Sequence, residues 1–334
     1  MSRGNIQEAP LERLKLSLEM ASFRGEMRVK ELMSEHTSLK IGGPVDAVVF
    51  PEDAASLKSF LIASSGEKMP FFVLGGGTNL LVKDSGVDGN AISLKAFRNI
   101  KEIENIERIA GTLEGAEAGT SAGLFVESGV PLGRLINYTK EKGYSGLEAL
   151  AGIPGSFGGA VYMNAGAFGS EIKDVIVSVA LMKTDGEISI LKKDQLKFSY
   201  RSSNLPEDSI ILSANIILRK DSAENVAGRI REFLGKKRQS QPLGKPSAGC
   251  VFKNPVGIDS YREGDSAGRL IEAAGCKGMR AGDVEVSNVH ANYFINNGNA
   301  SGKDFLELMG KVKAKVQETS GVMLEPEIKI IGKD

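Results

Sequence analysis

Three side chains in the second half of the sequence could act on an anionic substrate: Arg201, Cys250 and Glu327. Arg201 carries a permanent charge on a planar guanidinium group, which suits a carboxylate or an enolate. Cys250 could donate a proton or act as a nucleophile, and Glu327 forms a pair of carboxylates with Glu325. Each side chain taken alone also has a plainer interpretation, namely a solvated arginine, a small core cysteine and surface carboxylates.

Two glycine-rich segments could bring backbone amides close to a phosphate group. In Leu74-Gly75-Gly76-Gly77-Thr78-Asn79, successive N–H groups could form a nest for an anion. This segment is neither an alternating-glycine dinucleotide fingerprint nor a Walker loop, and a plain turn is the alternative. Residues 151–169 contain six glycines, which cost conformational entropy unless the backbone geometry requires them. They indicate a backbone-lined ligand cleft, with a tightly packed helix of small residues as the alternative.

The charge balance and the scarcity of cysteine and histidine disfavour several classes of protein. Lys plus Arg equals Asp plus Glu at 42 each, so the chain has little electrostatic attraction for nucleic acid or an anionic membrane. Cys250 and Cys276 are too few for a four-cysteine metal site or a disulfide framework. His36 and His290 lack the spacing of a helical metal site, and no Gly-X-Ser-X-Gly motif occurs. Without a signal sequence or a long apolar run, we expect a cytoplasmic protein that holds no metal.

Several domains must position these residues, because 334 residues exceed one comfortable hydrophobic core. We expect a helix over residues 10–33, a small α/β unit over 41–94 and a β-rich region over 100–220. Proline and glycine interrupt residues 239–248, which predicts a boundary or ligand loop before a third domain. Local patterns predict further elements: helices at 54–64, 225–237, 267–274 and 305–316, a helix opened by Pro131, a hairpin at Asp185-Gly186, strands at 209–218 and 293–295, and a strand pair around Glu325-Pro326-Glu327.

In identity and order, several motifs resemble the UDP-N-acetylenolpyruvoylglucosamine reductase family, enzymes of peptidoglycan precursor synthesis. The resemblance covers nearly everything after residue 35. No extra substrate-capping insertion is evident between Tyr200 and Ile230, so the chain resembles the shorter class of this family. The motifs are His36-Thr37-Ser38-Leu39-Lys40-Ile41-Gly42-Gly43-Pro44, the triple-glycine loop, Ile153-Pro154-Gly155-Ser156, Tyr200-Arg201, Ser247-Ala248-Gly249-Cys250-Val251-Phe252-Lys253-Asn254-Pro255 and Glu325-Pro326-Glu327-Ile328-Lys329-Ile330-Ile331-Gly332.

The resemblance implies an α+β fold, in which a two-part FAD-binding module of the vanillyl-alcohol-oxidase (PCMH) type precedes a smaller α/β substrate-binding domain. With the composition of the segments, it predicts an N-terminal helical segment at 1–35, FAD-binding subdomains at 36–96 and 97–224, and a substrate-binding domain at 225–334. The implied cofactors are FAD and NADPH. The expected protein is a monomer that binds neither nucleic acid nor membrane.

The resemblance also implies roles for individual residues. The residues expected to bind FAD are Gly75, Gly76, Gly77, Thr78, Asn79, Pro154, Gly155, Ser156, Gly159, Asn164 and Gly166. The residues expected to bind the UDP-sugar are Tyr200, Arg238 and Asn254, with Lys237 beside Arg238. The expected catalytic residues are Arg201, Cys250 and Glu327.

In the reaction of this family, NADPH reduces FAD, and the flavin passes a hydride from N5 to C3 of UDP-N-acetylglucosamine enolpyruvate. A proton then reaches C2 and completes UDP-N-acetylmuramate. By the resemblance, Arg201 would stabilise the negative charge that develops on the substrate, and Glu327 would supply a hydrogen-bond donor. Cys250 stands where the family pattern has a serine as proton donor. A thiol, whose ordinary pKa is about 8.5, is chemically competent for that task.

Two other functions fit parts of the pattern. A different FAD oxidase or dehydrogenase of the same fold could act on an alcohol or a hydroxy acid, because a fold alone does not specify the reaction. The glycine loops would also suit an inactive regulator that binds a flavin or a nucleotide sugar. The segment from Cys250 to Asn254 and Glu327 favour the cell-wall reductase over the alternative oxidase or dehydrogenase, whereas yellow protein without reductase activity would indicate the regulator.

Overall fold

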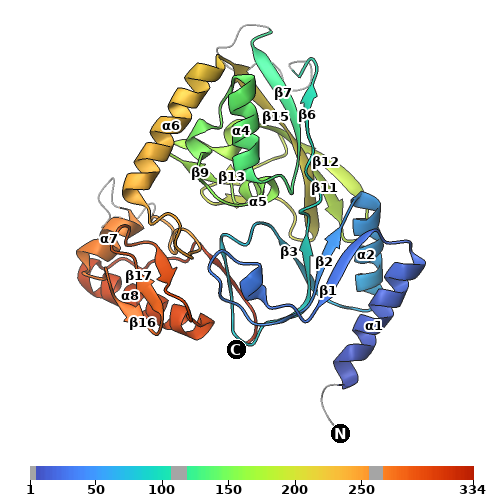
Figure 1. Ribbon diagram of the computed structural model, residues 1–334, viewed down its shortest axis with the longest axis horizontal. Helices are drawn as coiled ribbons and strands as arrows, with labels where there is room; N and C mark the ends of the chain where they lie inside the picture. The colour runs from blue at the N-terminus through green and yellow to red at the C-terminus, as the bar shows by residue number, and fades with distance from the viewer. Residues whose placement is uncertain (1–4, 107–118, 256–265) are drawn as a thin grey trace. The chain divides into compact units, whose positions relative to one another are not determined.

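The structure, a computed structural model, describes residues 5–106, 119–255 and 266–334 (Figure 1). Its internal contacts divide the chain into two units, each assembled from three separate stretches of sequence. Unit 1 comprises Met1–Arg28, Ala47–Gly76 and Gly89–Gly235, and unit 2 comprises Val29–Asp46, Gly77–Asp88 and Lys236–Asp334. The domain boundaries predicted after residues 35, 96 and 224 stay predictions. Within the described ranges, every helix is too short or too polar to span a bilayer.

The first sheet of unit 1 packs against two helices. The elements are α1 (Asn5–Met20), α2 (Ala54–Gly66), β1 (Gly25–Val29), β2 (Val45–Pro51), β3 (Phe71–Leu74) and β5 (Val87–Ser93). The strands run in the order β1-β2-β5-β3, with β3 and β5 parallel. Helix α2 begins after Asp53, whose carboxylate accepts a hydrogen bond of 2.8 Å from the Ser56 N–H, as expected of an N-cap. The apolar faces of α1, α2, β2 and β5 form one core.

The helix predicted over residues 10–33, and with it an entirely helical segment 1–35, is wrong beyond Met20. There α1 ends, and Ser22 adopts a left-handed φ of 53°. A Cβ atom at Gly25 would lie 2.3 Å from the Phe50 carbonyl oxygen, so this residue packs directly against the neighbouring strand. The chain from Gly25 is the sheet strand β1. Glycine is a poor helix former, and sheet pairing overrides the helical pattern beyond it.

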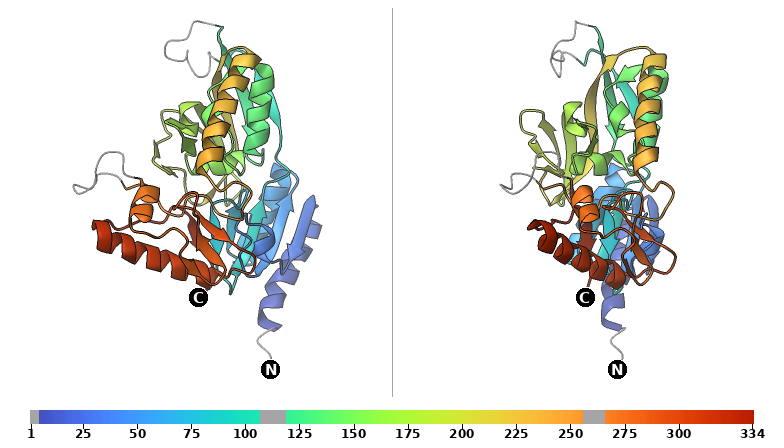
Figure 2. Two further views of the ribbon diagram at one scale, coloured as in Figure 1. Left: turned by 60° about the vertical axis from the view of Figure 1, so that its left-hand side comes forward. Right: turned by 90° about the vertical axis from the view of Figure 1, so that its left-hand side faces the viewer.

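The second sheet of unit 1 is antiparallel, with strand order β12-β11-β15-β7-β6 and β8 paired with β15. Its strands are β6 (Ile100–Ile103), β7 (Ser121–Glu127), β8 (Tyr144–Ser145), β11 (Ile176–Lys183), β12 (Ile188–Lys192) and β15 (Ser209–Lys220). The associated helices are α4 (Leu132–Lys142), α5 (Phe157–Tyr162) and α6 (Ala223–Ser240). Figure 2 shows α4 and α6 side by side, and both contribute to the core of this sheet. The structure confirms the helix after Pro131, the hairpin at Asp185-Gly186 and the buried strand 209–218.

Unit 2 contains a three-stranded antiparallel sheet packed against a long helix. Its elements are β4 (Leu80–Val82), α7 (Ala267–Ala273), β16 (Arg280–Ala281), β17 (Val284–Val286), β18 (Phe294–Asn296), α8 (Gly302–Ser320) and β19 (Lys329–Ile331). The sheet order is β16-β17-β18, and α8 contacts β16 and β17. A capping box of Ser301 and Asp304 begins α8, and Gly321 ends it with a φ of 71°. The apolar stripe predicted over residues 305–316 is buried in the core of unit 2.

The strand pair predicted around Glu325-Pro326-Glu327 does not form. Only β19 follows this segment, and it pairs in parallel with β4. Residues 325–327 instead lie beside residues 251–253, where Phe252 and Pro326 form an isolated bridge. Proline has no backbone N–H to donate, which limits a regular ladder at this position. The two carboxylates are therefore held by a short irregular contact rather than by a hairpin.

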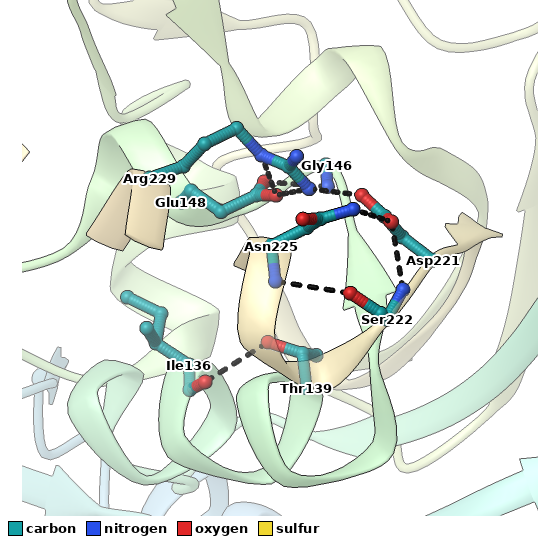
Figure 3. Close-up of polar contacts among 8 residues, drawn as sticks. All are labelled: Ile136, Thr139, Gly146, Glu148, Asp221, Ser222, Asn225 and Arg229. Atoms are coloured by element: carbon teal, nitrogen blue, oxygen red, sulfur yellow. Dashed lines mark hydrogen bonds and ion pairs between the residues drawn. The ribbon is translucent and has the colours of Figure 1, made fainter. Parts of the chain in front are cut away.

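Polar side chains fix the start of α6 to the end of β15 (Figure 3). Asp221 accepts hydrogen bonds of 2.7 Å from the Ser222 N–H and 2.9 Å from the Asn225 side chain. Ser222 in turn accepts a hydrogen bond of 3.1 Å from the Asn225 N–H. These bonds satisfy backbone donors that the first turn of a helix leaves without intrahelical partners.

Arg229 joins this helix to the segment after β8 (Figure 3). Its guanidinium donates to Glu148 at 2.9 Å and to Asp221 at 2.6 Å. The Glu148 side chain is only 8% exposed and also accepts a hydrogen bond of 2.7 Å from the Gly146 N–H. Burial acts to raise the pKa of Glu148, but the hydrogen bonds from Gly146 and Arg229 outweigh it and lower that pKa below 4.5. A buried charge is thus held by several donors, as its desolvation requires.

We expect Arg229→Met to lower the free energy of unfolding by about 1–3 kcal/mol at neutral pH, because it deprives a buried carboxylate of a charged partner. Arg13→Met is the matched control, because Arg13 is 58% exposed in its ion pair with Glu67. Loss of the Arg13–Glu67 ion pair should lower the free energy of unfolding by less than about 1 kcal/mol. Urea unfolding of both variants measures these changes. Equal losses in the two variants would contradict the importance of the Arg229 ion pair.

The difference between wild type and Arg229→Met should also shrink in acid. Hydrogen bonds from Asn225 and Arg229 lower the pKa of Asp221 to about 2, and the pKa of Glu148 is lowered too. A carboxyl with a lowered pKa stabilises the folded state above its unfolded pKa, and this contribution disappears as the pH falls through its folded pKa. Urea unfolding at neutral pH and near about pH 2, the folded pKa of Asp221, should therefore show a larger loss of unfolding free energy for wild type than for Arg229→Met. If the difference in unfolding free energy between wild type and Arg229→Met is the same at both pH values, the lowered carboxyl pKa values do not contribute to stability.

Asn90 is a polar residue inside the first core of unit 1. It is fully buried on β5, two residues before Ile92, and alternation places both side chains on the same face of the strand. Ile92 packs there with Leu57 and Phe60. Neither polar atom of the Asn90 side chain has a hydrogen-bond partner among the described residues. Burial of the Asn90 amide therefore costs free energy that no hydrogen bond to the described residues offsets.

We expect Asn90→Leu to raise the free energy of unfolding by about 1–3 kcal/mol, because an apolar side chain of similar size removes the unsatisfied amide. Asn292 is the matched control, since it is 2% exposed but exchanges hydrogen bonds of 2.9 Å and 2.7 Å with the backbone of Phe252. Asn292→Leu should be destabilising. Thermal and urea unfolding measure both changes, and a loss of stability in Asn90→Leu would show that its amide is satisfied.

Candidate active site

The predicted site residues divide between the two units. Unit 1 contains Gly75, Gly76, Pro154, Gly155, Ser156, Gly159, Asn164, Gly166, Tyr200 and Arg201. Unit 2 contains Gly77, Thr78, Asn79, Arg238, Cys250, Asn254 and Glu327. The chain passes from unit 1 to unit 2 in the middle of the triple-glycine loop, between Gly76 and Gly77.

Within unit 1, the two glycine-rich segments contact each other through their backbones. A Cβ atom at Gly76 would lie 2.6 Å from the Gly155 Cα, and one at Gly75 would lie 3.0 Å from the Ser156 Oγ. Ser156 caps α5 and accepts a hydrogen bond of 3.3 Å from the Gly159 N–H. Gly75 and Gly76 are exposed, so the surface they present is backbone. Such a surface lets an anion approach peptide amides without interference from side chains, which fits the pyrophosphate of a dinucleotide.

Asn164 ties two short hairpins of unit 1 together. The first hairpin is β9 (Gly166–Ala167) with β10 (Ser170–Glu171), and the second is β13 (Phe198–Ser199) with β14 (Ser202–Ser203). The fully buried Asn164 side chain donates to the Ser199 carbonyl at 3.0 Å and accepts from the Lys173 N–H at 3.3 Å. Its part in binding a cofactor stays a prediction, because these contacts already explain its burial.

Arg201 occupies the turn of the second hairpin in a left-handed conformation, with a φ of 56°. Its guanidinium donates to the Gly166 carbonyl at 3.2 Å, and its Cζ lies 4.9 Å from the centroid of the Tyr200 ring. Tyr200 and Arg201 are both half-buried. The structure therefore brings the predicted residues Gly166, Tyr200 and Arg201 together, and it holds the guanidinium from both hairpins.

Within unit 2, the rest of the triple-glycine loop packs against two other segments. A Cβ atom at Gly77 would lie 2.0 Å from the His36 carbonyl oxygen, and the φ of Gly77 is +62°. Both features require glycine. The Asn79 side chain donates to the Glu327 carbonyl at 3.2 Å. Parallel pairing of β4 and β19 continues this contact, so the loop and the C-terminal motif are held in register.

Cys250 and Glu327 lie on neighbouring segments of unit 2. The Glu327 N–H donates to the carbonyl of Val251, the residue after Cys250, at 2.8 Å. Cys250 and Glu327 are both half-buried. The Glu325 side chain, in contrast, is 75% exposed and lies 3.7 Å from the Lys253 Nζ. Of the two carboxylates, Glu327 thus has the more enclosed position.

The residues predicted to bind the UDP-sugar differ in their surroundings. Asn254 accepts a hydrogen bond of 3.0 Å from the N–H of Ala267, the first residue of α7, so it helps to begin that helix. Arg238 is exposed in the last turn of α6. Its neighbour Lys237 is 2% exposed, and burial lowers its pKa to about 8. The spacing of Lys237 from the buried Ile230, two helical turns earlier, could have predicted its burial.

Comparisons with known proteins agree with this arrangement. Residues 45–192 match the model of the FAD binding domain, and residues 241–331 match that of the UDP-N-acetylenolpyruvoylglucosamine reductase C-terminal domain. The reductase of Geotalea uraniireducens is 39% identical over 315 residues, which cover 94% of this chain and 97% of that protein. The reductase of Syntrophomonas wolfei is 40% identical over 309 residues, which cover 92% and 96%. The chain belongs to the UDP-N-acetylenolpyruvoylglucosamine reductase family.

A solved structure of this reductase family has the same fold. The crystal structure of UDP-N-acetylenolpyruvylglucosamine reductase from Thermus caldophilus superposes with a TM-score of 0.73 at 34% identity and covers 92% of this chain and 99% of that one. The predicted α+β class, with an FAD-binding module and a smaller C-terminal domain, is confirmed. FAD is the cofactor of the family, and the backbone surface at Gly75, Gly76 and Gly155 fits its pyrophosphate.

Proposed function

We propose that this chain catalyses the NADPH-dependent reduction of UDP-N-acetylglucosamine enolpyruvate to UDP-N-acetylmuramate. The similarity to reductases of this name over more than nine-tenths of both chains carries the proposal. FAD, held at the backbone of Gly75, Gly76 and Gly155, would supply the hydride chemistry that links NADPH to C3 of the enolpyruvyl group. The protein contributes binding, orientation, electrostatic stabilisation and a proton.

The glycine surface of unit 1 supports a role in holding the pyrophosphate of FAD. Gly75 and Gly76 expose their backbone, and they lie against the Gly155 backbone and the Ser156 hydroxyl, which accepts from the Gly159 N–H. We assign Pro154, Asn164 and Gly166 to the same role, and Gly77, Thr78 and Asn79 continue the triple-glycine loop. Helix caps and loop amides of this kind stabilise a pyrophosphate because their dipoles are fixed before the ligand binds.

Arg201 is the residue that stabilises negative charge on the substrate in this proposal. Hydride addition at C3 leaves an electron pair at C2 beside a carboxylate, so negative charge accumulates there before a proton arrives. A guanidinium fixed by the Gly166 carbonyl and the Tyr200 ring needs little reorganisation to meet this charge. Tyr200, Arg238 and Asn254 orient the UDP-sugar, and the buried Lys237 adds positive charge beside Arg238.

Cys250 delivers the proton to C2 in this proposal, and Glu327 supplies a hydrogen-bond donor. Their half-buried positions on adjacent segments of unit 2 support these roles. Glu327 is chosen over Glu325 because Glu325 is exposed and paired with Lys253. A positioned proton donor contributes about 10²–10⁴-fold to the rate of such a step.

We also propose that the protein works as a monomer in the cytoplasm, without a nucleic acid or membrane partner. A formal net charge of zero gives little general attraction for either polyanion. Within the described ranges, Cys250 and Cys276 are not joined in a disulfide, as is usual in a reducing compartment. Light scattering of the purified protein measures the oligomeric state, and a stable dimer would contradict this part of the proposal.

Purified protein should be yellow, and the enolpyruvyl UDP-sugar should trigger NADPH oxidation. The flavin spectrum and the absorbance of NADPH measure both properties in one sample. Turnover of an alcohol or hydroxy acid in place of the UDP-sugar would identify the alternative oxidase. A yellow protein that binds the UDP-sugar without turnover would identify the alternative regulator.

We expect Cys250→Ala to slow flavin reoxidation by the UDP-sugar by about 100-fold or more, because no proton donor remains. Cys250→Ser should retain turnover, since a hydroxyl can replace the thiol as donor. Stopped-flow absorbance of the reduced enzyme measures this step. Cys276→Ala is the matched control, because Cys276 is a fully buried thiol in the core of unit 2. Equal reoxidation rates in wild type and Cys250→Ala would refute the proton-donor role.

A further inference from the structure

Glu171 is a charged residue of the first hairpin of unit 1 that the proposed chemistry does not use. It is the last residue of β10 and pairs in register with Gly166 of β9. Its side chain is 22% exposed and forms an ion pair with Lys173. Its backbone N–H donates to Asp174 at 2.8 Å in a capping box, so the hairpin and the following turn fix its position.

The surroundings of Glu171 keep its carboxyl ionised. Partial burial acts to raise its pKa, but hydrogen bonds from Lys173 and Asn164 and the charges of Lys173 and Arg201 lower it overall. The carboxylate therefore interacts electrostatically with Arg201, although the two residues lie on different hairpins. Asn164 contacts both hairpins, because it bonds to Glu171 and to the Ser199 carbonyl.

Gly166 is where the two side chains converge. Its carbonyl accepts the hydrogen bond of 3.2 Å from Arg201. On the same residue, a Cβ atom would lie 2.8 Å from the Glu171 Cγ and 2.7 Å from the Ser170 carbonyl oxygen. The missing side chain of Gly166 thus leaves the room that the Glu171 side chain occupies. The Arg201 guanidinium and the stem of the Glu171 side chain therefore both lie against Gly166.

We propose that Glu171 is a positioning residue for Arg201, which holds the guanidinium in the orientation that meets the developing charge on the substrate. This inference rests on the proposed role of Arg201. An arginine side chain has many rotamers, so a fixed carboxylate beside it reduces the side-chain entropy that must be lost when the transition state forms. Lys173 offsets the charge of Glu171, so Arg201, Glu171 and Lys173 together retain one positive charge for the substrate.

Glu171→Gln tests this proposal because it removes the charge but keeps the size of the side chain. We expect flavin reoxidation by the enolpyruvyl UDP-sugar to slow by about tenfold, because a misplaced group affects the step that uses it. Flavin reduction by NADPH, the FAD content and the thermal unfolding midpoint should stay close to those of wild type. The UDP-sugar dissociation constant, measured from its perturbation of the oxidised flavin spectrum, should change less than the reoxidation rate.

The matched control is Glu187→Gln, which removes an equally lysine-paired carboxylate of unit 1. Glu187 is 62% exposed and lies 2.6 Å from the Lys183 Nζ. This variant should leave both half-reactions unchanged. If Glu187→Gln slows flavin reoxidation as much as Glu171→Gln does, the slower rate results from the loss of a negative charge anywhere on unit 1. The proposal is then wrong. Glu171→Asp, which keeps the charge but shortens the side chain, should fall between wild type and Glu171→Gln.

A double-mutant cycle with Arg201→Lys separates the two roles. If Glu171 acts through Arg201, Glu171→Gln should slow flavin reoxidation much less in the Arg201→Lys background, because lysine lacks the planar guanidinium that Glu171 orients. Additive losses would overturn the positioning role and leave the role of Arg201 intact. An unchanged reoxidation rate in Arg201→Lys would overturn the proposed role of Arg201, and the positioning role with it. NADPH turnover with the UDP-sugar in that variant would still support the proposed reaction.

Discussion

The absence of a Cβ atom at two neighbouring positions is the constraint on which the proposed cofactor site depends. Gly76 packs against the backbone of Gly155 in unit 1, and Gly77 packs against the His36 carbonyl in unit 2. The chain leaves one unit and enters the other between these residues. Any side chain at either position would have to displace backbone atoms, which are held by loops and sheets rather than by flexible groups. Glycine is therefore required at both positions, on either side of the point where the chain passes from one unit to the other.

Backbone contacts also organise the proposed catalytic side chains. Arg201 takes its place from a hairpin turn with a left-handed φ, and its guanidinium rests on the Gly166 carbonyl. Glu327 takes its place from hydrogen bonds that its own N–H and carbonyl make with Val251 and Asn79. Side chains fixed in this way need little reorganisation when charge develops on a substrate, which is the main way a protein lowers such a barrier.

A cysteine at the proposed proton-donor position brings a chemistry different from that of an alcohol. A thiol is a stronger acid than an alcohol, but its thiolate is also open to oxidation. Half-burial of Cys250 between Tyr293 and the C-terminal segment limits its exposure. Cys276, in contrast, is fully buried, and burial raises its pKa, so it stays a protonated core residue. Within unit 2, the Cys250 thiol is thus half-buried and the Cys276 thiol is fully buried.

The sequence by itself determined the family, the glycine loops and most of the regular elements, because these depend on local composition and motif order. Only the tertiary structure decided that the first helix ends at Met20, since sheet pairing competes there with helix propensity. It also distinguished the enclosed Glu327 from the exposed Glu325. The convergence of Glu171 and Arg201 on Gly166 has no local signal, because it joins residues of two hairpins that only the folded chain brings together.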